Sequence, residues 1–210
     1  MPDSQALLPR LPLPSCYGTA TCTYSSLPVR LSFGILYSRW PILTQLASEQ
    51  QEPTLLRRAV VLGGLLKRIG NFNMMRNFRD RLIFQKTTYL LQAFGLYLGY
   101  EFSWYLYGPY SPGLAKDGFG LLPHYQGLKP FVFPSNQAEQ RFEEFVRFLG
   151  DRRSDAVWLE AVASVHSLRK IYPLLAQDEI INRVAAKQPY FTRRDAEEAW
   201  RTLDSAGLLS

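Results

Sequence analysis

Few side chains in this chain of 210 residues have the type and spacing that catalysis or metal binding requires. His124 and His166 are its two histidines, and neither has a cluster of cysteine or aspartate beside it. The two cysteines, Cys16 and Cys22, lie near the start of the chain. A zinc site needs four protein ligands, or three and a water molecule. We therefore expect no metal site and no bound cofactor.

The motifs of nucleophilic and phosphate chemistry are missing as well. The sequence contains neither a G-x-S-x-G nucleophile turn nor a G-x-x-x-x-G-K-[ST] phosphate loop. The glutamate pairs 143–144 and 197–198 lie on predicted helices, where neighbours in sequence point in different directions. Neither pair can face one substrate as acid and base. The sequence therefore predicts a protein that is not an enzyme and has no catalytic residues.

The net charge of +6 is concentrated in residues 57–86, where Asp80 is the only acid. Such a surplus suits a solvated helix face, a docking site for an acidic partner, or a contact with nucleic-acid phosphates. For nucleic acid, the candidate residues are Arg76, Arg79, Arg193, Arg194 and Arg201.

Residues 1–54 are predicted to be an irregular, proline- and serine-rich extension, separate from the domain at 55–210. They hold seven of the fourteen prolines, and proline removes a backbone donor and interrupts helices. This part is either a flexible extension or sequence upstream of the native start. Its apolar run at 27–43 is broken by arginine and proline before it reaches the roughly 20 residues of a membrane span. We expect a cytoplasmic protein without a membrane span.

The domain itself is predicted to be mainly α-helical, because its apolar residues recur at helical spacing. Helix starts are expected at Ser111 followed by Pro112, at Asn136 with Glu139, and at Thr192 with Asp195. The alternating aromatic segment 101–107 predicts a strand that pairs with 130–133. The predicted fold is a single helical domain with a small two-stranded β element and a C-terminal helix-turn-helix-like pair. The main helices are expected at 55–69, 76–98, 136–149 and 155–172.

One block of the sequence resembles a known family. It combines a helix containing Phe84-Gln85-Lys86 with an aromatic segment and the turn 107–111, Tyr-Gly-Pro-Tyr-Ser. This order is similar to the YwgA-like uncharacterised proteins of bacteria and archaea, which are related to the SocA-type antitoxin (Panacea) family. The resemblance covers residues 56–210, and further matching residues are Tyr89, Leu90, Gln92, Trp104 and Leu114.

The resemblance implies a non-catalytic protein–protein interaction module, antitoxin-like or adaptor-like, in a prokaryotic toxin–antitoxin or defence context. Its partner would be a protein such as a toxin. We expect partner contacts from Lys86, Tyr105, Tyr107 and Tyr110. Structural roles are expected for Gln85, Gln92, Trp104, Gly108, Pro109 and Ser111, with the buried glutamines bonding to backbone groups at 108–111. The alternative is a winged-helix-type DNA-binding transcriptional regulator that uses the arginines named above.

Overall fold

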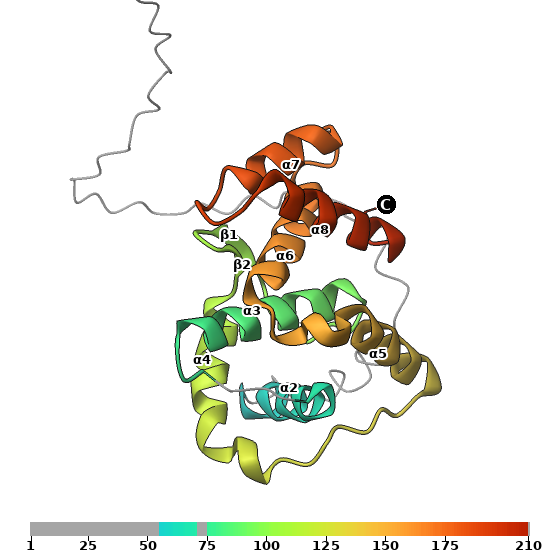
Figure 1. The fold of residues 1–210 in the computed structure, drawn as a ribbon. Coiled ribbons are helices and arrows are strands. Elements are labelled where there is room, and N and C mark those ends of the chain that lie inside the picture. The colour runs from blue at the N-terminus through green and yellow to red at the C-terminus, as the bar shows by residue number, and fades with distance from the viewer. Residues whose placement is uncertain (1–54, 71–74, 210) are drawn as a thin grey trace, which may run out of the picture. The chain divides into compact units, whose positions relative to one another are not determined.

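The computed structural model describes residues 55–70 and 75–209, and this part of the chain is mainly helical, as predicted (Figure 1). Two short 3-10 helices, η1 (Leu122–Gly127) and η2 (Gly150–Ser154), follow α4 and α5. The extension at 1–54, with Cys16 and Cys22, lies outside the described residues. The α-helices are α2 (Leu55–Ile69), α3 (Phe78–Ala93), α4 (Pro112–Leu121), α5 (Asn136–Leu149), α6 (Ala156–Ile171), α7 (Gln177–Ala185) and α8 (Arg193–Ser205).

Side-chain caps fix where several of these helices begin. Ser111 caps α4 by accepting from the backbone N–H of Leu114, and Pro112 occupies the first turn. Thr192 and Asp195 form the predicted capping box of α8. At α5 the helix begins where predicted, but the capping residue is Ser135 rather than Asn136, because the Ser135 hydroxyl accepts from Ala138 N–H.

The two-stranded element is a local hairpin. β1 (Ser103–Tyr105) pairs antiparallel with β2 (Gly108–Tyr110), so the predicted pairing of 101–107 with 130–133 was wrong. The second strand begins at the Gly108-Pro109 step. The apolar run at 130–133 packs against α2 and α5 instead. The Phe131 N–H donates to the Gly64 carbonyl of α2, and the Phe133 ring lies against the Phe142 ring of α5.

The central helix α3 is shorter than predicted, because it ends at Ala93 rather than near residue 98. The Gln92 side chain accepts from Leu98 N–H and Tyr100 N–H and donates to the Tyr100 carbonyl. These three bonds stabilise a loop in place of the last helical turn. Gly95, with φ of +86°, provides the left-handed residue that usually ends a helix.

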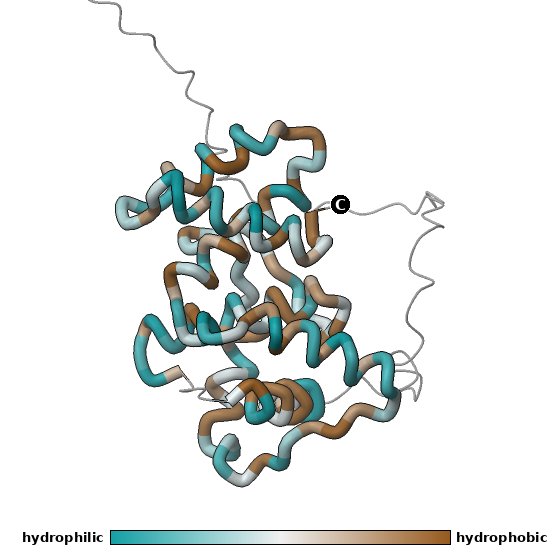
Figure 2. The backbone as a smooth tube through the Cα atoms, turned by 45° about the vertical axis from the view of Figure 1, so that its right-hand side comes forward, coloured by the Kyte–Doolittle hydropathy of each residue, from teal (hydrophilic) through white to brown (hydrophobic). Residues whose placement is uncertain are grey.

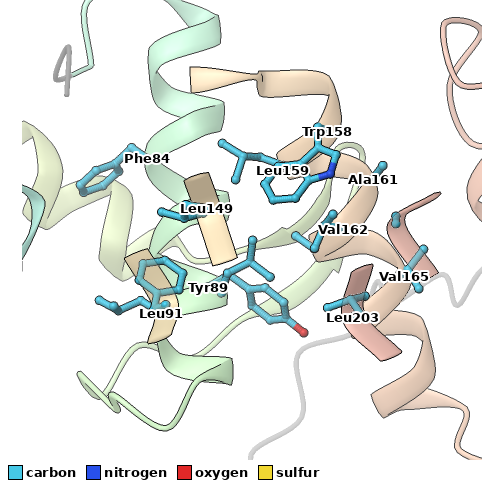
Figure 3. Close-up of a cluster of buried hydrophobic side chains, with 14 of the residues drawn as sticks. Phe84, Tyr89, Leu91, Leu149, Trp158, Leu159, Ala161, Val162, Val165 and Leu203 are labelled. Atoms are coloured by element: carbon cyan, nitrogen blue, oxygen red, sulfur yellow. The ribbon is translucent and has the colours of Figure 1, made fainter. Parts of the chain in front are cut away.

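The core is organised around α6, which contacts α3, α7, α8 and strand β2 (Figure 1). Within single helices, hydrophobic and hydrophilic residues follow one another along the backbone, as expected of helices with one buried face (Figure 2). Figure 3 shows Leu159, Val162 and Val165 of α6 in the same cluster as Tyr89 of α3 and Leu203 of α8. This packing fixes the places of α3, which carries Lys86, and of β2, which carries Tyr110.

Two glycines allow close packing around α2. A methyl group at Gly63 would collide with the Leu128 side chain, and one at Gly64 would lie 3.0 Å from the Lys129 carbonyl oxygen. The segment after α4 therefore runs directly against α2, which explains the adjacent glycines that weaken the helix intrinsically.

Candidate functional site

A cavity of about 310 Å³ lies between α3, the 103–110 hairpin and α4, and we name it the hairpin pocket. It brings together the four side chains that the sequence nominated for partner contact, Lys86, Tyr105, Tyr107 and Tyr110. Cavities of this size are at the lower end for binding a small molecule or a side chain of another protein.

Aromatic rings form the walls of the hairpin pocket. Tyr107 packs edge-on against Phe78 at 4.8 Å between ring centroids, and Tyr105 lies 5.7 Å from Tyr110. Phe78, Tyr105 and Phe119 all line the cavity and remain 51%, 59% and 53% exposed. The walls are therefore apolar surface that water still reaches.

Gln85 holds the turn after the hairpin in place. Its side-chain N–H donates to the Ser111 carbonyl over 2.9 Å, and its oxygen accepts from Ser111 N–H over 3.0 Å. This is the expected contact with the 108–111 turn. Gln92 does not share it, since its bonds go to Leu98 and Tyr100. Ser111 in turn caps α4, so one buried glutamine positions both the hairpin end and the start of the next helix.

Lys86 is 2% exposed, and its Nζ donates to the Pro109 carbonyl oxygen over 2.7 Å. Burial lowers the pKa of its ammonium group to about 7, although the negative charge of Glu160 acts in the opposite direction. Lys86 thus lines the hairpin pocket from α3 and supports the hairpin backbone. We expected Lys86 to contact a partner, but a side chain that is buried to this degree has almost no surface for direct contact.

Gly108 permits the hairpin to approach α6 closely. Its φ of +83° is left-handed, and a methyl group on it would lie 2.5 Å from Ser164 Oγ and 3.7 Å from Lys86 Nζ. Any other residue would combine backbone strain with a collision. The predicted structural role of this glycine thus has a geometric basis in the structure.

Glu160 is a buried carboxylate that sequence analysis missed. It is 1% exposed on α6, and one oxygen accepts from the Tyr190 hydroxyl over 2.8 Å. Burial raises its pKa, while the Tyr190 hydrogen bond and the charges of Lys86 and Lys187 lower it. The only signal in the sequence is that this acid is flanked by the apolar residues of a predicted buried helix. A buried charge requires a partner elsewhere in the fold, so such a position indicates an internal contact.

The segment before α8 fastens the hairpin to the C-terminal helices. Lys187 donates to the Tyr105 carbonyl and Gln188 to the Leu106 carbonyl, both over 2.8 Å. The Lys187 ammonium also lies 4.0 Å from the centroid of the Trp104 ring. Burial lowers the pKa of Lys187 to about 8, against the opposite effect of Glu160. Trp104 therefore makes a cation–π contact that helps to hold the hairpin against the segment before α8.

The histidine on α6 is used structurally. His166 Nδ1 lies 2.7 Å from the Tyr89 hydroxyl oxygen, a buried hydrogen bond, and burial lowers the pKa of His166 to about 4. A second hollow of about 390 Å³ adjoins His166 and Arg169, but Arg169 donates to the carbonyls of Pro173, Leu175 and Leu209. Across 55–70 and 75–209, no three His, Cys, Asp or Glu side chains are grouped to hold a metal ion.

The arginines nominated for nucleic acid are partly engaged within the protein. Arg76 lies 3.5 Å from Asp80, Arg79 donates to the Ser154 carbonyl, and Arg193 pairs with Asp178 and Glu197. Within the described part of the chain, Arg194 and Arg201 are exposed, and their guanidinium groups have no hydrogen-bond or ion-pair partner. Internal pairing reduces the positive charge that three of the five can offer to phosphates.

Comparison of the chain with protein-family models, with curated proteins and with solved structures finds no match. None of the helices in residues 55–70 and 75–209 has the length and apolar content to cross a membrane.

Proposed function

We propose that the chain is a non-catalytic protein–protein interaction module, antitoxin-like or adaptor-like, whose partner binds over the hairpin pocket. The observation that carries the proposal is the group of exposed rings, Phe78, Tyr105 and Phe119, around a preformed cavity. Aromatic side chains are enriched in protein interfaces because they bury a large area at little cost in conformational entropy.

The support beneath the rings is rigid, which favours binding. Gln85 and Lys86 hold the hairpin from α3, while Lys187 and Gln188 hold it from the C-terminal segment. A surface that is already ordered loses less entropy when a partner binds. Lys86 acts in this proposal through the Pro109 carbonyl and not by direct contact with the partner.

The experiment that tests this proposal is site-specific photocrosslinking of the full chain in cells of its source organism. A photoreactive phenylalanine analogue replaces Tyr105 at the pocket or, as the matched control, the exposed Gln140 on α5. We expect a discrete crosslinked protein from position 105 that position 140 does not give. Identical crosslinks from both positions, or none from position 105, would contradict the proposal.

A DNA-binding regulator is the second candidate, favoured by the exposed and unpaired Arg194 and Arg201 in the described region. It predicts binding to duplex DNA that weakens steeply with salt. Fluorescence anisotropy with a labelled duplex tests it. Reversal of both charges to glutamate should then abolish binding, and unchanged binding would exclude this docking surface.

A further inference from the structure

The charged side chains that line the hairpin pocket are both basic. Arg81 and Lys86 line it, and no aspartate or glutamate is among its described lining residues. Lys86 is buried, already donates to a carbonyl and interacts electrostatically with the Glu160 carboxylate, so it offers little positive charge to an incoming ligand. Arg81 is the group that an incoming ligand can reach.

Arg81 is half-buried. Its guanidinium group has no hydrogen-bond or ion-pair partner among residues 55–70 and 75–209, although its backbone N–H donates to the Asn77 carbonyl. Arg81 lies three residues after Phe78 and four before Gln85 on α3, so these three side chains share one face of the helix, and all three line the pocket. A guanidinium group in such a place has lost part of its hydration without gaining a protein acceptor. Carboxylates are its favoured partners, because two parallel N–H donors match their two oxygens.

The remaining lining is apolar or aromatic, including Leu82, Phe119 and the hairpin tyrosines. The ligand therefore needs an apolar part for these walls and an anionic group for Arg81. A cavity of about 310 Å³ has room for one large side chain and not for a folded element.

We propose that the hairpin pocket binds a segment of the partner protein that inserts one aromatic or large aliphatic side chain and places an adjacent carboxylate against Arg81. This inference rests on the proposed interaction function and specifies the chemistry of the partner: an acidic, apolar peptide segment. The complementarity lies in the unpaired Arg81 guanidinium beside a ring-lined cavity free of acidic lining residues.

The test is selection of random heptapeptides displayed on phage against the purified full chain and two charge-reversal variants. Arg81→Glu changes the pocket, and Arg147→Glu changes an exposed arginine of α5 as the matched control. Wild type and Arg147→Glu should enrich peptides with Asp or Glu next to an aromatic or large aliphatic residue. Arg81→Glu should lose this class and favour Lys or Arg at the same place.

Fluorescence anisotropy of one enriched, labelled peptide then gives the affinity. Loss of a charge-assisted contact is expected to weaken binding at least about tenfold in Arg81→Glu and in Arg81→Gln. Thermal unfolding checks that each variant is folded. Equal affinity of wild type and Arg81→Gln, or enrichment of peptides without acidic residues, would overturn the inference.

The two proposals fail in different ways. If position 105 crosslinks a partner but selection yields no acidic peptides, the interaction function remains and the chemistry proposed for the pocket is wrong. If neither experiment gives a pocket-dependent signal and labelled duplex DNA binds instead, both are wrong.

Discussion

Replacing Gly108 with alanine tests the close approach of the hairpin to α6. Gly108 has φ of +83°, and the added Cβ would lie 2.5 Å from Ser164 Oγ. Gly99 is the matched control, because its φ is +77° and no described atom lies within 4 Å of the same position. Both changes impose the left-handed cost of about 1–2 kcal/mol, and only Gly108→Ala adds an overpacking cost of about 1–3 kcal/mol. We expect losses of about 2–5 and about 1–2 kcal/mol respectively.

Urea unfolding followed by circular dichroism measures both losses by linear extrapolation. A Ser164→Ala background removes the colliding oxygen, and it costs little by itself because that oxygen has no hydrogen-bond partner in the described residues. Gly108→Ala should lose less stability in this background, with a coupling energy of about 1–3 kcal/mol. Equal losses at Gly108 and Gly99, together with no coupling to Ser164, would refute the reasoning.

Three further predictions concern buried polar groups, all measured by urea unfolding. Because burial lowers the pKa of Lys86 to about 7, the folded state releases a proton above pH 7 that the unfolded chain keeps. The free energy of unfolding should therefore rise by about 2 kcal/mol between pH 7 and 9. Lys86→Met should remove this rise, while the smaller rise from Lys187 persists. Burial lowers the pKa of His166 to about 4, so between pH 7 and 5 this histidine gains a proton in the unfolded chain and not in the folded one. The free energy of unfolding should therefore fall by about 2 kcal/mol over this range. An equal fall in the His166→Gln variant would contradict this. Gln85→Leu leaves the buried Ser111 N–H unpaired, while the Ser111 carbonyl keeps its bond from Ala115 N–H, and should cost about 1–3 kcal/mol. The exposed control Gln140→Leu should cost less than about 0.5 kcal/mol.

The parts of the fold that sequence could predict depend on neighbours along the chain. The capping box at Thr192 and Asp195 lies within one turn, as does Ser111 followed by Pro112. Helix α5 at Asn136–Leu149 has the predicted bounds, because its apolar stripe repeats at helical spacing. Such features need no knowledge of the tertiary structure.

The failures involve contacts between distant segments. The strand at 103–105 pairs with its immediate successor because a tight hairpin costs little loop entropy, whereas the apolar run at 130–133 finds a better place for its rings against α2 and α5. No local pattern predicts that Gln92 bonds to a loop and shortens α3.

The candidate site shows the same division. The motif containing Gln85, Lys86 and the 107–111 turn predicted which segments meet, and three of the four nominated contact residues are tyrosines on the pocket wall. Sequence did not separate buried Lys86 from half-buried Arg81, five residues earlier, nor did it find Glu160. Burial at these positions is decided by which helix packs on which face.

Amide hydrogen exchange of the full chain, alone and with the protein crosslinked from position 105, tests the central proposal most directly. We predict slower exchange on binding across the hairpin at 103–110 and across α4, with exchange in α5 unchanged. Protection confined to α8 with an unchanged hairpin would contradict the hairpin pocket as the binding surface.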